Sequence, residues 1–121
     1  MREVHRYGVV LACLIMGWGL ASMGGQIVFA ASGDAARGKS IYQAKCVNCH
    51  GPQGKGDGRL GKKLKPPASD FTSADSKKKS EDELLNVIKN GVPKTSMVAW
   101  GKKLSEAEQQ DVLAHVLTLR K

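Results

Sequence analysis

The chain has 121 residues and a formal net charge of +8, and its apolar residues are concentrated in the first 30 positions. Beyond Ala30 only 31 of 91 residues are hydrophobic, and nine of these are alanine, which leaves few large side chains for a core. This length excludes a multidomain enzyme, and so thin a core predicts that a bound cofactor fills part of the interior.

The N-terminal segment, residues 1–30, has the organisation of a secretory signal peptide. Arg2 and Arg6 precede an uncharged, largely apolar run of 23 residues that ends in Val-Phe-Ala, a small-residue cleavage pattern. We expect cleavage after Ala30 and export of the working domain, residues 31–121, to the periplasm. The alternative is retention as a membrane anchor, because 23 uncharged residues can span a bilayer.

The net charge of residues 31–121 limits the kinds of partner that this domain is expected to bind. These residues carry 17 Lys and Arg against 10 Asp and Glu, a net charge of +7 that favours acidic partners. Nucleic-acid binding would need several aromatic platforms, and only Tyr42, Phe71 and Trp100 are present. We therefore expect protein partners and no nucleic-acid binding.

Residues 34–48 are good helix formers, and this predicted helix leads into the run Cys46-Val47-Asn48-Cys49-His50. A disulfide or a thioredoxin-like redox pair would not need the histidine, and no βαβ pattern surrounds it. A zinc ribbon would need a second cysteine pair, which residues 31–121 do not contain. The spacing is that of covalent haem attachment, so we expect one haem c bound by both thiols, with His50 on the iron.

The second axial ligand decides whether the iron carries electrons or binds small molecules. Met97 is the only methionine after Ala30, and it lies in a Pro- and Gly-flanked loop between two predicted helices. A lone methionine more often fills a core, but this loop has little else apolar around it. His115, the only other histidine there, lies inside an amphipathic helix, where packing is its expected role. We therefore expect His50 and Met97 to be the metal ligands.

A loop and two helices complete the predicted fold. The Gly- and Lys-rich residues 51–65 predict an irregular loop around the cofactor, followed by Pro66 and Pro67. A carbonyl of this proline pair could accept the Nδ1 proton of His50, unless the prolines only end the loop. Two capping boxes, Ser-Glu-Asp-Glu from residue 80 and Ser-Glu-Ala-Glu from residue 105, open helices with apolar stripes. Without any alternating strand pattern, we expect an all-α fold with about three main helices.

These residues resemble the class I monohaem c-type cytochromes over nearly all of residues 31–121. The resemblance rests on Gly38, Tyr42, the Cys46–His50 run, Gly56–Gly58, Pro66–Pro67, Phe71, Met97, Ala99–Gly101 and Leu113–Leu119. It implies a small cytochrome c fold wrapped around one haem, thioether bonds to Cys46 and Cys49, and axial ligation by His50 and Met97. It also implies that the first helix crosses the last near Gly38, and that Trp100 lies by a haem propionate or the haem edge.

Two positions depart from the family pattern. Val98 stands where the family often has proline after the methionine, which predicts a softer ligand loop and a weaker iron–sulfur bond. His115 stands where an aromatic residue is common, which predicts a more polar contact with Tyr42.

Together the motifs predict a monomeric one-electron carrier and not an enzyme, because both axial positions are filled. We expect it to pass electrons between respiratory or dehydrogenase proteins whose acidic surfaces attract lysines near the haem crevice. Membrane contact would come only through an uncleaved N-terminal segment or membrane-bound partners. The alternatives are an anchored haem subunit of a larger redox complex, and a haem-based ligand sensor or peroxidase-like protein from which Met97 dissociates. The lysines expected at the crevice are Lys45, Lys55, Lys62, Lys63, Lys65, Lys94, Lys102 and Lys103.

Overall fold

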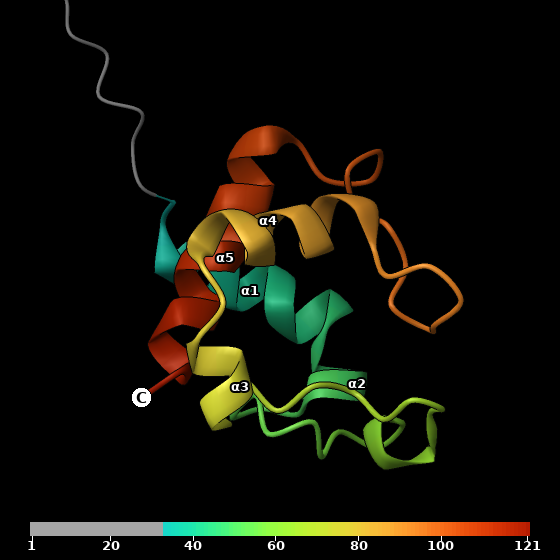
Figure 1. Ribbon diagram of the computed structural model, residues 1–121. Coiled ribbons are helices and arrows are strands. Elements are labelled where there is room, and N and C mark those ends of the chain that lie inside the picture. The colour runs from blue at the N-terminus through green and yellow to red at the C-terminus, as the bar shows by residue number, and fades with distance from the viewer. Residues whose placement is uncertain (1–32) are drawn as a thin grey trace, which may run out of the picture.

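The computed structural model describes residues 33–121, which form helices joined by loops (Figure 1). The all-α prediction is confirmed, because this part of the chain contains no strand and its three longest helices are α1, α4 and α5. None of the described helices is long and apolar enough to cross a bilayer. The predicted signal peptide, residues 1–30, lies outside the described residues. The elements are α1 (Ala35–Lys45), α2 (Val47–His50), the short 3-10 helix η1 (Gly61–Lys63), α3 (Ala74–Lys77), α4 (Glu81–Asn90) and α5 (Glu106–Leu119).

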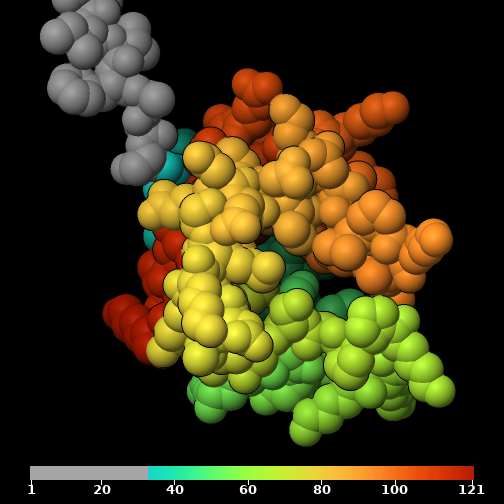
Figure 2. Space-filling model, viewed as in Figure 1, coloured from blue at the N-terminus to red at the C-terminus, as the bar shows by residue number. Residues whose placement is uncertain are grey.

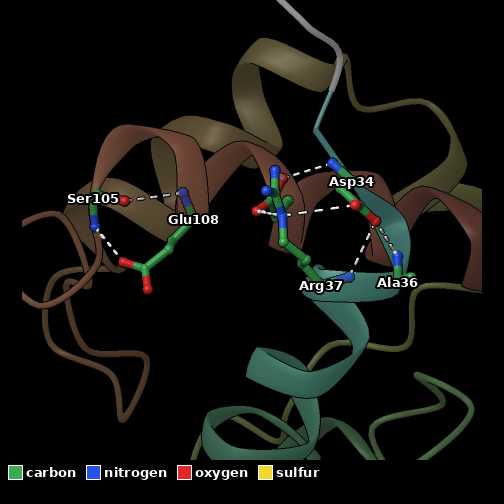
Figure 3. Close-up of polar contacts among 6 residues, drawn as sticks. Asp34, Ala36, Arg37, Ser105 and Glu108 are labelled. Carbon is green, nitrogen blue, oxygen red and sulfur yellow. Dashed lines mark hydrogen bonds and ion pairs between the residues drawn. The ribbon is translucent and has the colours of Figure 1, made fainter.

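Helices α1 and α5 cross at close range. Gly38 permits this approach, because a Cβ at this position would collide with the backbone carbonyl of Asp111. The Asp34 side chain caps α1 by accepting from the N–H groups of Ala36 and Arg37 at 2.8 and 3.1 Å. The Asp34 backbone N–H donates to Asp111 Oδ1 at 2.6 Å, and Arg37 Nε donates to Asp111 Oδ2 at 3.0 Å (Figure 3). The expected crossing near Gly38 is present, and a buried carboxylate fastens it.

Helices α4 and α5 begin where their capping boxes predict. The Ser80 hydroxyl accepts from the N–H of Glu83 at 3.2 Å, and the Glu83 carboxylate accepts from the N–H of Ser80 at 2.7 Å. Ser105 and Glu108 make the same pair of bonds at the start of α5 (Figure 3). Helix α5 packs against both α4 and α1, and the three helices share a small core. Its buried hydrophobic residues are Tyr42, Leu84, Ile88, Val112, Leu113 and Val116.

The chain between α2 and α4 consists largely of loops held by backbone hydrogen bonds. The N–H of Phe71 donates to the carbonyl of Gly54 at 2.7 Å, which closes the glycine-rich loop. Arg120, just after α5, donates to the carbonyls of Ser76 and Lys79, the latter at 3.0 Å. The C-terminal end of the chain therefore holds α3 in place.

Candidate functional site

One cavity of about 560 Å³ brings together the residues that the sequence singles out. Its walls are mainly apolar, and they come from α1, α2, α4, α5 and the loops on either side of α4. Figure 2 shows it as a hollow between the orange segment that follows α4 and the yellow-green segment after η1. All six predicted site residues line it, namely Cys46, Cys49, His50, Pro66, Met97 and Trp100.

The cysteine motif forms one helical turn at the end of α1. The predicted helix over residues 34–48 is interrupted at Cys46, which ends α1 by donating its N–H to Tyr42 at 2.8 Å and starts α2. The His50 N–H donates to the Cys46 carbonyl at 3.0 Å, so the thiols and the imidazole share one wall. No disulfide joins Cys46 to Cys49.

The environment of Cys46 differs from that of a redox-active thiol. Burial raises the pKa of Cys46 to about 11, and the nearby Cys49 adds a smaller contribution. Catalytic and redox-active cysteines have lowered pKa values instead, because they need the thiolate. The structure therefore argues against a thioredoxin-like pair.

His50 is oriented by a backbone carbonyl and by an aromatic ring. Its Nδ1 lies 3.2 Å from the carbonyl oxygen of Ser69, which can only accept, so the Nδ1–H donates and Nε2 is left as an acceptor. The ring stacks on Phe71 with centroids 4.6 Å apart and an interplanar angle of 19°. Burial lowers the pKa of His50, against a smaller raising effect of the Ser69 hydrogen bond. A neutral imidazole of fixed tautomer is the form that binds a metal.

The structure decides between the two interpretations of the proline pair. A carbonyl of Pro66 or Pro67 could have accepted the Nδ1 proton of His50, but the Ser69 carbonyl does so, which favours the alternative that the prolines end the loop. The Ala68 N–H, in the residue before Ser69, donates to the Gly61 carbonyl at 3.0 Å, which ties this segment to η1. Pro66 still lines the cavity.

Met97 lies in a loop that is closed by its own backbone. The Val92 N–H donates to the Met97 carbonyl at 3.0 Å, and the Met97 N–H donates to the Thr95 hydroxyl at 3.1 Å. Gly91, with φ of 67°, makes the turn from α4 into this loop, where a Cβ would crowd the Met97 carbonyl. The half-buried Met97 side chain lines the cavity, and so does the neighbouring Val98, which is more exposed.

Trp100 is fixed to the C-terminal end of α4. The backbone N–H of Trp100 donates to the carbonyl of Ile88 at 3.0 Å, and the Lys103 ammonium lies 5.1 Å from the centroid of the indole ring. The indole thus forms part of the cavity wall next to the Met97 loop. His115, the other candidate ligand, does not line this cavity and packs against Tyr42 instead, with ring centroids 5.0 Å apart.

Two lysines line the cavity itself. Of the expected set only Lys45 lines it, and the second lining lysine is Lys79. Lys79 ends the run Lys77-Lys78-Lys79, which directly precedes the α4 capping box in the sequence. The position of Lys79 next to a predicted helix was the only feature of the sequence that could have pointed to it.

The chemistry of this cavity fits a haem. Its volume lies within the usual range of cofactor pockets, and its wall offers two thiols and an imidazole acceptor nitrogen, with a thioether on a separate loop. Within residues 33–121 no group of three or more His, Cys, Asp or Glu is placed to hold a metal ion. In a haem the macrocycle itself supplies nitrogen ligands to the iron, so the protein has to provide only the axial ligands.

Comparison with known proteins points the same way. The family model described as cytochrome C oxidase, cbb3-type, subunit III matches residues 33–116. Cytochrome c6 of Rippkaea orientalis is 35% identical over 91 residues, which cover 73% of this chain and 73% of that protein. Cytochrome c-554(547) of Halothiobacillus neapolitanus is 31% identical over 97 residues, which cover 74% of this chain and all of that protein.

Solved structures share the fold. The KustC0563 c-type cytochrome superposes with a TM-score of 0.54 at 28% identity, over 69% of this chain and 93% of that one. A chain of the Kuenenia stuttgartiensis reducing HAO-like protein complex Kustc0457/Kustc0458 superposes with a TM-score of 0.63 at 25% identity. That match covers 73% of this chain and 43% of the other, so this chain spans less than half of that protein.

Proposed function

The chain belongs to the class I c-type cytochromes and carries a covalently bound haem c, and on this premise we propose that it is an exported one-electron carrier. We assign Cys46 and Cys49 to the thioether bonds and His50 and Met97 to the two axial positions. The observation that carries this assignment is that one cavity is lined by all four residues and not by His115. Pro66 and Trp100, which line the same cavity, are assigned to contacts with the haem.

The residues around the iron hold it in one coordination state. The haem itself supplies the ferric–ferrous couple, which takes up and releases one electron at a time. The Ser69 carbonyl holds the Nδ1 proton of His50, which fixes the ring and raises the basicity of Nε2. The hydrogen-bonded loop from Val92 to Met97 would hold the Met97 thioether as the second protein ligand of the iron. With both axial positions filled no substrate reaches the iron, so we propose no enzymatic turnover.

The ferric absorption spectrum tests the ligand assignment. We expect a low-spin spectrum with a methionine-to-iron charge-transfer band, which Met97→Ala abolishes and the neighbouring Val98→Ala retains. The reduction potential should fall in Met97→Ala, because thioether ligation favours ferrous iron. A high-spin resting spectrum in the wild type would overturn the assignment and favour a ligand sensor or a peroxidase-like protein.

The charge of the domain supports redox proteins with acidic docking surfaces as partners of a monomeric carrier. Residues 31–121 have a net charge of +7, and Lys45 and Lys79 stand at the cavity itself. Electrostatic steering predicts that the bimolecular electron-transfer rate falls as salt rises. Lys79→Gln should lower that rate more than Lys39→Gln, since Lys39 does not line the cavity. A rate independent of salt would contradict steering.

A second candidate function is a haem subunit within a larger redox complex. Two findings favour it, because the matching family model is described as an oxidase subunit and one structural neighbour is part of a protein complex. Expression of the full chain followed by N-terminal sequencing and native mass measurement separates the two candidates. A monomer that begins near Ala31 supports the free carrier, whereas a retained N-terminal segment that co-purifies with other redox subunits supports the complex.

A further inference from the structure

The loop that carries Met97 is fixed to α4 at both of its ends. At its start, the Gly91 N–H donates to the Val87 carbonyl at 2.8 Å. At its far end, the Trp100 N–H donates to the Ile88 carbonyl at 3.0 Å. The residues between these two anchors, Met97 among them, therefore depend on hydrogen bonds within the loop itself.

A threonine hydroxyl links two parts of this loop. The Thr95 hydroxyl donates to the Val92 carbonyl at 2.8 Å and accepts from the Met97 N–H at 3.1 Å. Thr95 also lines the haem cavity, but a hydroxyl has only one proton to donate, and Val92 takes it. The hydroxyl thus acts on the loop, where it ties Met97 to Val92.

The backbone on either side of this bridge needs contacts to keep its shape. Lys94 has a φ of 60°, in the left-handed region that residues other than glycine seldom adopt. Such a conformation persists only where surrounding contacts impose it, and the bond from Thr95 to Val92 spans Lys94. Val98, directly after Met97, has no ring that would lock its φ as proline does. The Thr95 bridge therefore supplies an order that the neighbouring residues do not.

We propose that Thr95 is a positioning residue for the iron, whose hydroxyl bridge holds the Met97 backbone and so keeps the thioether on its axial position. This inference rests on the proposed axial role of Met97. Ser96 provides a matched comparison, because it carries a hydroxyl one position further on, is exposed, and takes no part in the bridge.

The test is the displacement of Met97 by imidazole in the ferric, haem-loaded protein, followed at the methionine-to-iron charge-transfer band. At saturating imidazole the rate is limited by dissociation of Met97, so it measures how firmly the loop holds the ligand. Thr95→Val keeps the shape of the side chain without the hydroxyl and should raise this limiting rate about tenfold, since the Met97 N–H loses its acceptor. Thr95→Ser keeps the hydroxyl and should stay close to the wild-type rate, and Ser96→Ala should leave the rate unchanged.

Two results would overturn the proposal. Equal limiting rates in Thr95→Val and Ser96→Ala would mean that the Thr95 hydroxyl does not hold the ligand. A rate in Thr95→Ser as high as that in Thr95→Val would mean that the threonine methyl group acts, and not the hydroxyl. Either result in a protein whose wild type shows the charge-transfer band leaves the axial role of Met97 intact, whereas a wild type without this band refutes that role and this proposal with it.

Discussion

The α1–α5 crossing and the haem cavity are held together in different ways. At the crossing, protein contacts protein, because Gly38 lets the backbones meet and Asp111 bonds to Asp34 and Arg37. Around the cavity, helices supply part of the wall, and the rest comes from loops whose main links are backbone hydrogen bonds, such as that between Val92 and Met97. The haem therefore completes one half of the molecule, which explains how a chain with so few large apolar residues can fold.

Removal of the haem is the strongest way to test this contrast. In the double variant Cys46→Ala, Cys49→Ala the covalent bonds cannot form, and we expect the whole cooperative unfolding transition to be lost. Circular dichroism during thermal unfolding measures this, and hydrogen exchange should show residual protection confined to α1 and α5. A compact form of the variant that melts cooperatively without haem would contradict the prediction.

The variant Gly38→Val tests the α1–α5 crossing. The new side chain meets the Asp111 carbonyl, so the two helices must move apart, at a cost of about 2–3 kcal/mol. Denaturant unfolding of the haem-loaded protein measures the loss, and Ser40→Ala, at an exposed position of the same helix, is the control. The native ferric spectrum should be unchanged, because Gly38 does not line the haem cavity. If Gly38→Val lowered the stability and also changed the ferric spectrum, the α1–α5 crossing and the haem cavity would not be separate regions.

Local patterns in the sequence predicted the features that depend on neighbouring residues. The capping boxes at Ser80 and Ser105, the all-α fold and the haem motif at Cys46 all follow from residues within a few positions of one another. The family resemblance implied the helix crossing near Gly38, but individual hydrogen bonds between distant residues could not be predicted. Asp111 bonds to a residue 77 positions away, and Ser69 reaches His50 only because of how an intervening loop folds.

The short helix α3 and a second cavity, lined by His115 and by residues of α1, escaped prediction for the same physical reason. α3 has four residues, too few to show an apolar period, and it is fixed by Arg120, which lies 41 positions beyond Lys79. The position of His115 in a helix was predictable, but its cavity is made by α1 as well as α5. Only the assembled fold shows that Lys39 stands beside it.

Acid should weaken the crossing through Asp111, whose side chain is only 5% exposed. The hydrogen bond from the Asp34 N–H lowers the pKa of Asp111 most, and Arg37 lowers it further. The stabilisation that ionised Asp111 adds to the free energy of unfolding is therefore fully present above the ordinary carboxyl pKa. It is lost as the pH falls through the lowered pKa. At neutral pH Asp111→Asn should cost about 2 kcal/mol, the scale of hydrogen bonds to a charged group.

The difference in free energy of unfolding between Asp111→Asn and the wild type should shrink as the solution is acidified, because the wild-type carboxyl then becomes neutral too. Denaturant unfolding across the acidic range measures it. Asp75→Asn is the matched control, since Asp75 pairs with Lys78 on the exposed surface at 3.5 Å and should change stability little. A difference that stays constant with pH would mean that the Asp111 charge plays no part.

The smallest expected effect compares the two capping boxes. Ser80→Ala and Ser105→Ala each remove one hydroxyl acceptor from a helix start, so each should cost about 1 kcal/mol of stability. Their consequences for the iron should differ, because the helix that Ser80 caps runs directly into the Met97 loop, whereas α5 lines the cavity only through Val112 and Val116, well beyond its start at Ser105. We therefore expect Ser80→Ala alone to raise the rate at which added imidazole displaces Met97 from the iron. If both variants raised this rate equally, loosening of the crossing would be transmitted to the ligand loop, and the two regions would act as one unit.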